Sequence, residues 1–163
     1  MTWLSEDRLA LLVTSTMLDA SLPEDERKSF EKELRFEREN AMNIGDCIVS
    51  LVQQTYESSS VAEENASLCL AVAMLLEGMI EQGWREGTCF SDKPMVMKQL
   101  YNLCGLLASR LKEEGRSVKK LFRVVAQCMA KVCVIEYPSD VWEDFIESQL
   151  RTVNSDEASA CLL

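Results

Sequence analysis

The chain carries the uncharged run ASLCLAVAMLL, from Ala66 to Leu76, in which small residues are interspersed among large ones. Periodicity alone does not separate a buried strand from a buried helix here, but the Ala, Leu and Met content favours a helix. The preceding Ser60-Val61-Ala62-Glu63 has the pattern of a capping box. The sequence therefore predicts a central helix over residues 61–85. A helix that is apolar on nearly every side must be covered by other elements, so we expect it at the centre of an all-helical domain.

The composition of the whole chain predicts a few long secondary-structure elements. The chain has 163 residues with only 6 Gly and 3 Pro, which is scarce for a fold built from many tight turns. Its length suits one domain with a substantial core. We expect a single domain over residues 1–152 and a flexible C-terminal tail over 153–163.

Apolar residues recur at helical spacing in five further segments. One helix is expected over 3–19 with Ser5 as its N-cap, and another over 23–56, opened by a Ser21 to Glu24 capping box. Asn43-Ile44-Gly45-Asp46 is the weak point of that long helix and predicts a kink or a break there. The remaining helices are expected over 94–114, 117–135 and 139–151. The fold class is thus all-α, with six to seven antiparallel helices.

Two architectures fit helices of this length with short connections. One is a stack of helical hairpins, as in HEAT, armadillo or MIF4G modules. The other is a globular bundle around one central apolar helix, as in Bcl-2-like folds. The expected helix starts are irregularly spaced, so no repeat period is detectable. The likeness to either group is one of architecture and rests on no shared motif.

Charge and cysteine usage indicate a soluble protein of a reducing compartment. The net charge of −10 disfavours non-specific nucleic-acid binding and anionic membrane surfaces. No uncharged run approaches the roughly 20 residues of a membrane span, and the N-terminus lacks the pattern of a signal peptide. The 7 cysteines form no C-x-x-C pair. We therefore expect reduced, structural thiols and a cytoplasmic or nuclear location.

The sequence lacks the residues and motifs that carry out the common types of enzyme catalysis. It has 0 His, which removes the most frequent general base and metal ligand and every Ser-His or Cys-His pair. No glycine-rich phosphate loop and no calcium-loop pattern occurs. We predict that the protein is not an enzyme, with no catalytic residue, no metal site and no cofactor.

Basic residues gather at one point of this acidic chain, between the fourth and fifth expected helices. One interpretation is compensation of the dipole at the end of the helix over 94–114, together with ordinary solubility. The other is a surface that binds an acidic peptide or a phosphate-bearing partner. Aromatic residues are too few nearby to indicate stacking on nucleic-acid bases. The whole group comprises Arg110, Lys112, Arg116, Lys119, Lys120 and Arg123, and Arg116, Lys119, Lys120 and Arg123 are the candidate partner-binding residues.

Three tryptophans, Trp3, Trp84 and Trp142, lie near the ends of expected helices. Tryptophans in this setting most often anchor the ends of a bundle. Alternatively, Trp84 and Trp142 form a groove wall for an amphipathic partner helix, and we include both as candidate partner-binding residues.

The predicted function is a non-enzymatic protein–protein interaction module, acting as an adaptor, a scaffold or a subunit of an intracellular complex. The alternative is a Bcl-2-like regulatory bundle that captures an amphipathic helix in a hydrophobic groove. In either case the partner is another protein, with no direct nucleic-acid binding and no membrane span expected.

Overall fold

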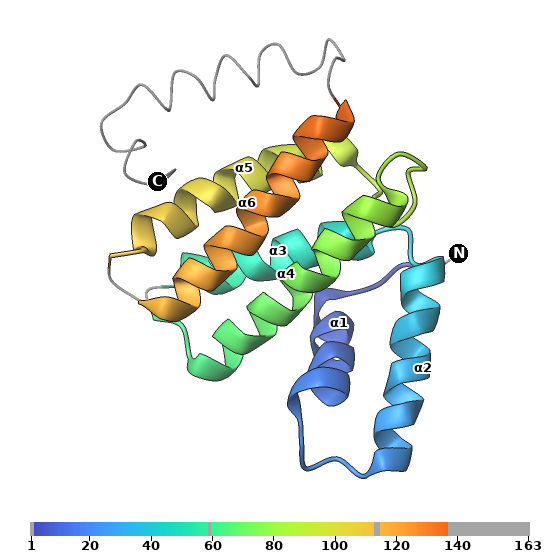
Figure 1. Ribbon diagram of the computed structural model, residues 1–163. Helices are drawn as coiled ribbons and strands as arrows, with labels where there is room; N and C mark the ends of the chain where they lie inside the picture. The colour runs from blue at the N-terminus through green and yellow to red at the C-terminus, as the bar shows by residue number, and fades with distance from the viewer. Residues whose placement is uncertain (1, 59, 113–114, 137–163) are drawn as a thin grey trace, which may run out of the picture.

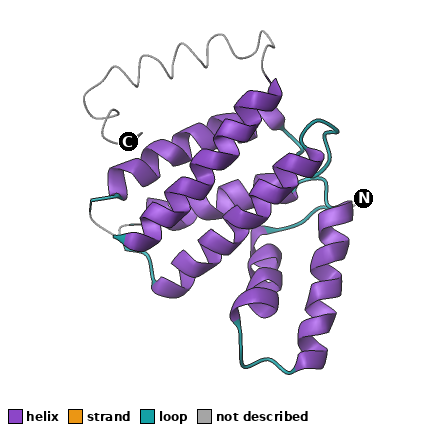
Figure 2. Ribbon diagram, in the orientation of Figure 1, coloured by secondary structure: helices purple, strands orange, loops and turns teal. Residues whose placement is uncertain are grey.

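The computed structural model describes residues 2–58, 60–112 and 115–136, and every regular element in these ranges is a helix (Figures 1 and 2). The only strand-like feature among them is one isolated parallel bridge between Thr2 and Ala41. The helix expected over 139–151, the expected tail and Trp142 lie outside the described residues. The elements are α1 (Glu6–Val13), the π-helical turn η1 (Thr14–Leu18), α2 (Glu24–Asn40), α3 (Ile44–Glu57), α4 (Glu63–Gly83), α5 (Lys93–Arg110) and α6 (Arg116–Glu136).

Four helices form two hairpins that lie side by side. Helices α3 and α4 form the first and α5 and α6 the second, with α3 packed on α5 and α4 packed on α6 (Figure 1). The Cys128 thiol approaches the Ala73 carbonyl at 3.9 Å, and further along both helices Trp84 Nε1 donates to Glu136 at 2.7 Å. These pairs advance together along the chain, so α4 and α6 run parallel. Neighbouring helices within each hairpin are antiparallel, as expected.

The N-terminal hairpin does not continue this stack. Helix α1 packs on α3 and α4, whereas α2 packs mainly on α1 and η1. Asn43, at the start of α3, fixes the N-terminal segment because its side chain accepts from the Leu4 amide and donates to the Leu4 carbonyl, both at 2.8 Å. The all-α prediction is confirmed. The molecule is a packed globular bundle in which hairpins stack once and no array of repeats forms.

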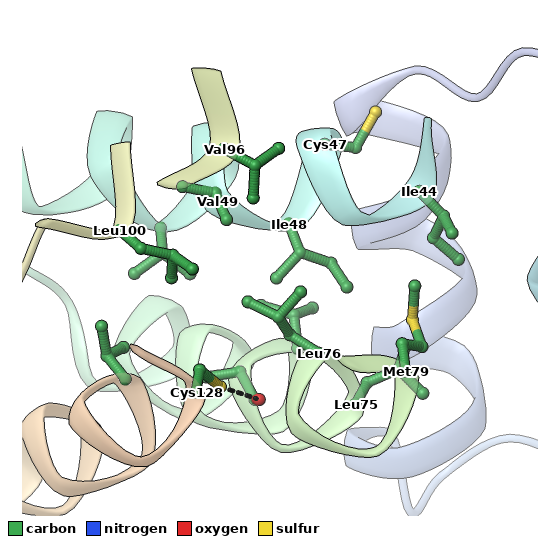
Figure 3. Packing of buried hydrophobic residues seen from close by; sticks show 14 of the residues in the cluster. Ile44, Cys47, Ile48, Val49, Leu75, Leu76, Met79, Val96, Leu100 and Cys128 are labelled. Atoms are coloured by element: carbon green, nitrogen blue, oxygen red, sulfur yellow. Dashed lines mark hydrogen bonds between the residues drawn. The ribbon is translucent and has the colours of Figure 1, made fainter. Parts of the chain in front are cut away.

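Helix α4 is the central helix, as the uncharged run predicts. It packs against α1, η1, α3 and α6. Figure 3 shows Leu76 of α4 facing Ile48 of α3 in the core. By length and composition alone α4 could also cross a membrane, but it is the core helix of this bundle. One line along α4 remains uncovered, because Ser67, Met74 and Glu81 are exposed, Met74 by 60%.

Both predicted capping boxes are wrong. The N-caps are Pro23 for α2 and Ala62 for α4, and neither makes a side-chain cap hydrogen bond. Ser21 instead donates to the carboxylate of Asp19, and the backbone at Ala62 is still extended, three residues into the box that Ser60 was expected to open. Each helix therefore begins after its expected cap.

The expected weak point in the long second helix is a full break. Helix α2 ends at Asn40, the backbone at Ala41 is extended, and α3 begins at Ile44. Ser5 caps α1 as predicted, since its side chain accepts from the Arg8 amide at 3.2 Å.

Replacing glycine with alanine should have opposite effects on stability at Gly45 and Gly105. A Cβ at Gly45 would collide with the ring of buried Phe90, whereas one at Gly105, inside α5, meets nothing within 4 Å. We expect Gly45→Ala to lower the free energy of unfolding by about 1–3 kcal/mol through overpacking. Gly105→Ala should raise it by about 0.5–1 kcal/mol, because alanine restricts the unfolded chain and favours helix. Urea unfolding of both variants checks this, and a stabilising Gly45→Ala would contradict the packing described.

Candidate functional site

The four predicted basic residues lie together on the outer face of α6. Arg116, Lys119, Lys120 and Arg123 are all exposed, and they alternate with buried Val118, Leu121 and Val125 on the inner face. Within the described part of the chain, none of the four forms an ion pair or a side-chain hydrogen bond. We call these four residues the basic face. The structure thus brings together on one surface the four cations that the sequence singled out.

The basic face is not explained by the dipole of the preceding helix. Helix α5 ends at Arg110, so compensation of its negative end involves Arg110 and Lys112. The basic face instead occupies the first two turns of α6, at the positive end of that helix, and the first turn of α6 contains no acid. The interpretation of these four residues as dipole compensation for α5 is therefore wrong, because the helix boundaries place them at the unfavourable end.

The spacing of the basic face adds further repulsion. Arg116 lies three and four residues before Lys119 and Lys120, and Arg123 lies four and three residues after them. Residues at these separations are neighbours on a helix, and like charges there destabilise it by about 0.2–0.5 kcal/mol per pair. An anionic partner would relieve this repulsion.

Three other cations in the described part of the chain, Arg8, Lys28 and Lys131, are paired with acids. Lys131, two turns further along α6, binds Glu77 at 2.8 Å and also Glu81, and these carboxylates raise its pKa. Glu63 and Glu64, at the start of α4, lie at the same end of the bundle as the basic face (Figure 1). They form no ion pair with the basic face, which remains without a charge partner among the described residues.

Trp84 is an internal anchor and is not part of an exposed groove. Its side chain is fully buried, with 0% exposure. Its ring meets Phe90 edge-on at 4.7 Å, and Lys93 Nζ lies 5.5 Å from the ring centroid. Its hydrogen bond to Glu136 joins the ends of α4 and α6. The expected contact of Trp84 with a partner is thus wrong for this conformation, because α6 and the residues after α4 enclose it.

Of the other two tryptophans, Trp3 is placed by the structure and Trp142 is not. Trp3 is 71% exposed, so it does not anchor the bundle, whereas the neighbouring Leu4 is buried. Trp142 lies outside the described residues, and its predicted contact with a partner stays a prediction.

The cysteines of the described residues have thiols that are neutral at pH 7. The six in the described residues are all free. Burial raises the pKa of Cys47 and Cys69 to about 11, and of Cys104 and Cys128 to about 12. A thiolate is the reactive species, so these thiols are poor nucleophiles at neutral pH.

These raised pKa values predict a loss of stability in alkali. The unfolded chain releases thiol protons near pH 9, whereas the folded chain holds those of Cys104 and Cys128 up to about 12. The stabilisation by neutral thiols is therefore complete below pH 9 and is lost as the pH rises from 9 towards 12. Urea unfolding at a series of pH values should show this fall, with a shallower fall for Cys104→Ala. Equal slopes for the two proteins would contradict the assignment.

One feature of the structure was not predicted from the sequence. A cavity of about 330 Å³ lies between α2, the end of α4 and the residues that follow α4, with Arg35 and Arg38 in its lining. In the sequence these arginines belong to a stretch of mixed charges typical of a solvated helix face. The i, i+3 spacing of two arginines was the available signal, but the other wall of the cavity comes from residues about fifty positions later.

A scan against protein-family models and searches of curated proteins and of solved structures each gave no match. The protein is therefore classified here by its fold and its candidate site alone. The protein is an all-α bundle of two stacked hairpins and an N-terminal hairpin, with an uncompensated basic face on its last described helix.

Proposed function

We propose that this protein is a non-enzymatic protein–protein interaction module and that the basic face of α6 binds an acidic segment of its partner. The observation that carries this proposal is the charge arrangement of α6. Four exposed cations lie at the positive end of a helix, within repulsive spacing and without ion pairs among the described residues, in a chain of net charge −10.

The partner chemistry follows from the same arrangement. Lysine and arginine donate to carboxylates, and complementary charge raises association rates and fixes orientation. The absence of aromatic residues on the basic face favours an acidic peptide over nucleic acid, as the sequence indicates. The six free cysteines support the further proposal that the module acts in a reducing compartment, in the cytoplasm or the nucleus.

The alternative proposal is capture of an amphipathic helix in a hydrophobic groove. It has less support, because Trp84 is enclosed and the exposed large apolar side chains are spread over α1, η1, α2, α4, α5 and α6 and the segments around residues 3 and 42. A fluorescent apolar dye that binds strongly to the folded protein without denaturant would favour this alternative.

The experiment that tests the proposal is affinity capture with the full chain as bait, followed by quantitative mass spectrometry. The four basic-face residues are all replaced by Glu. A matched control reverses four exposed cations elsewhere, Lys28, Lys32, Arg85 and Lys98. Circular dichroism checks that helicity is unchanged in both variants.

We expect the captured partner to be lost, by at least tenfold in abundance, with the basic-face variant and to be retained with the control. Equal capture by all three proteins would show that the basic face is not the binding surface. Loss with both variants would assign the effect to net charge and would also contradict the proposal.

A further inference from the structure

The cavity beside α2 is a second candidate binding site, separate from the basic face. Its volume of about 330 Å³ is at the lower end of the range for small-molecule sites. Figure 1 shows the C-terminal ends of α2 and α4 close together there. The polar residues of its lining are Arg35, Arg38 and Glu39 of α2, Gln82 of α4, and Thr88 and Cys89 from the segment between α4 and α5.

Two arginines dominate the charge of this cavity. Arg35 and Arg38 are one turn apart on α2, and neither guanidinium forms an ion pair or a hydrogen bond with a described residue. Among the described residues, Glu39 is the one acid in the lining of the cavity, and it is not paired with either arginine. A guanidinium binds a carboxylate or a phosphate through two parallel hydrogen bonds.

The wall opposite the arginines is held rigidly. The Cys89 carbonyl accepts from the Gly45 amide at 2.8 Å, and the Cys89 thiol donates to the Arg38 carbonyl at 3.3 Å. Asp46 accepts from the Ser91 amide at 2.8 Å, which fixes the same segment to α3. These contacts hold Cys89 at a φ of +73°, in the left-handed region that non-glycine residues rarely adopt.

The backbone strain at Cys89 and its location in the wall of the cavity both indicate a binding site. Strained residues persist only where the surrounding structure fixes them, and they concentrate at binding and catalytic sites. A rigid wall also lowers the entropy lost when a ligand binds. The cavity thus combines unpaired cations with a preorganised surface.

We propose that this cavity binds a small molecule through one phosphate or carboxylate group held by Arg35 and Arg38. The Gln82 amide is a further donor that lines the cavity, whereas the Thr88 hydroxyl donates to the Gly83 carbonyl at 3.4 Å. The carboxylate of Glu39 disfavours a second anionic group, so the site takes a ligand with a single anionic end. This site does not depend on the basic face.

The test uses inorganic phosphate and acetate as probes, each replacing chloride at equal ionic strength. Amide signals of Gly83, Thr88 and Cys89 are followed in proton–nitrogen NMR spectra of the full chain. We expect saturable shifts with at least one probe, and that probe identifies the anionic group. The Arg35→Gln/Arg38→Gln variant should lose at least tenfold in affinity. The Lys28→Gln/Lys98→Gln variant, which removes two exposed cations outside the cavity, should bind the probe unchanged.

Three outcomes would overturn this proposal. They are the absence of saturable shifts at these amides with both probes, equal affinity in the Arg35→Gln/Arg38→Gln variant, and shifts confined to amides of α6. None of these outcomes affects partner binding by the basic face, which is tested with different variants and a different readout.

Discussion

Replacing Trp84 with Ala should lower the free energy of unfolding by about 3–5 kcal/mol, the usual cost of truncating a large buried aromatic side chain. The indole is fully enclosed, meets Phe90 edge-on and donates to Glu136. Its removal leaves a cavity and also removes the hydrogen bond that the indole donates to Glu136. A loss of this size is a large fraction of the stability of an ordinary domain.

Two further variants keep this prediction testable if Trp84→Ala does not fold. Trp84→Phe keeps much of the apolar contact but loses the hydrogen bond, so it should be destabilised by less than the Ala variant. Trp3→Ala is the matched control, because Trp3 is 71% exposed and should change stability by no more than about 0.5 kcal/mol. Urea unfolding ranks the three variants. A Trp84→Ala protein as stable as Trp3→Ala would contradict the enclosed position of Trp84.

The Lys119→Glu/Lys120→Glu variant should be more stable than the natural chain and should bind the partner at least tenfold more weakly. Both new acids lie three or four residues from Arg116 and Arg123, so four repulsive pairs become attractive. They also place negative charge at the positive end of α6. We expect a gain of about 1–2 kcal/mol in the free energy of unfolding at low salt.

The matched control for this double variant is Arg85→Glu/Lys98→Glu, which changes the net charge equally at two exposed positions outside α6. It should leave partner binding unchanged and should not reproduce the gain in stability. Most substitutions destabilise a protein, so a stabilised variant with lost binding would identify residues kept for function at a cost in stability. A destabilised double variant would show that the repulsion assigned to the basic face is wrong.

Local patterns predicted the parts of the fold that depend on neighbouring residues. The uncharged run around Val72 gave the central helix, Ser5 gave the first cap, and the weak point at Asn43 and Gly45 gave the break between α2 and α3. The four residues of the basic face were singled out because they are close together in the sequence, and the structure places them on one exposed surface of α6. In each case the signal lies within a few residues of the feature that it predicts.

The failures involve contacts between distant residues or small shifts of a helix end. Trp84 is buried by Phe90 and Glu136, and Glu136 lies about fifty residues further along the chain, so its sequence neighbours did not indicate an enclosed position. The cavity beside α2 has the same origin. The dipole interpretation failed because α5 ends at Arg110, four residues earlier than expected, and the basic residues beyond it begin α6. Cap patterns alone did not fix these boundaries.

Calorimetric titration measures directly whether the basic face of α6 binds an acidic partner. The captured partner, or its acidic segment, is titrated into the natural chain and into the Lys119→Glu/Lys120→Glu variant at low and at physiological salt. We predict that affinity falls at least tenfold in the variant, and that salt weakens binding to the natural chain more than binding to the variant. Equal affinities for the two proteins, with the same salt dependence, would contradict the claim.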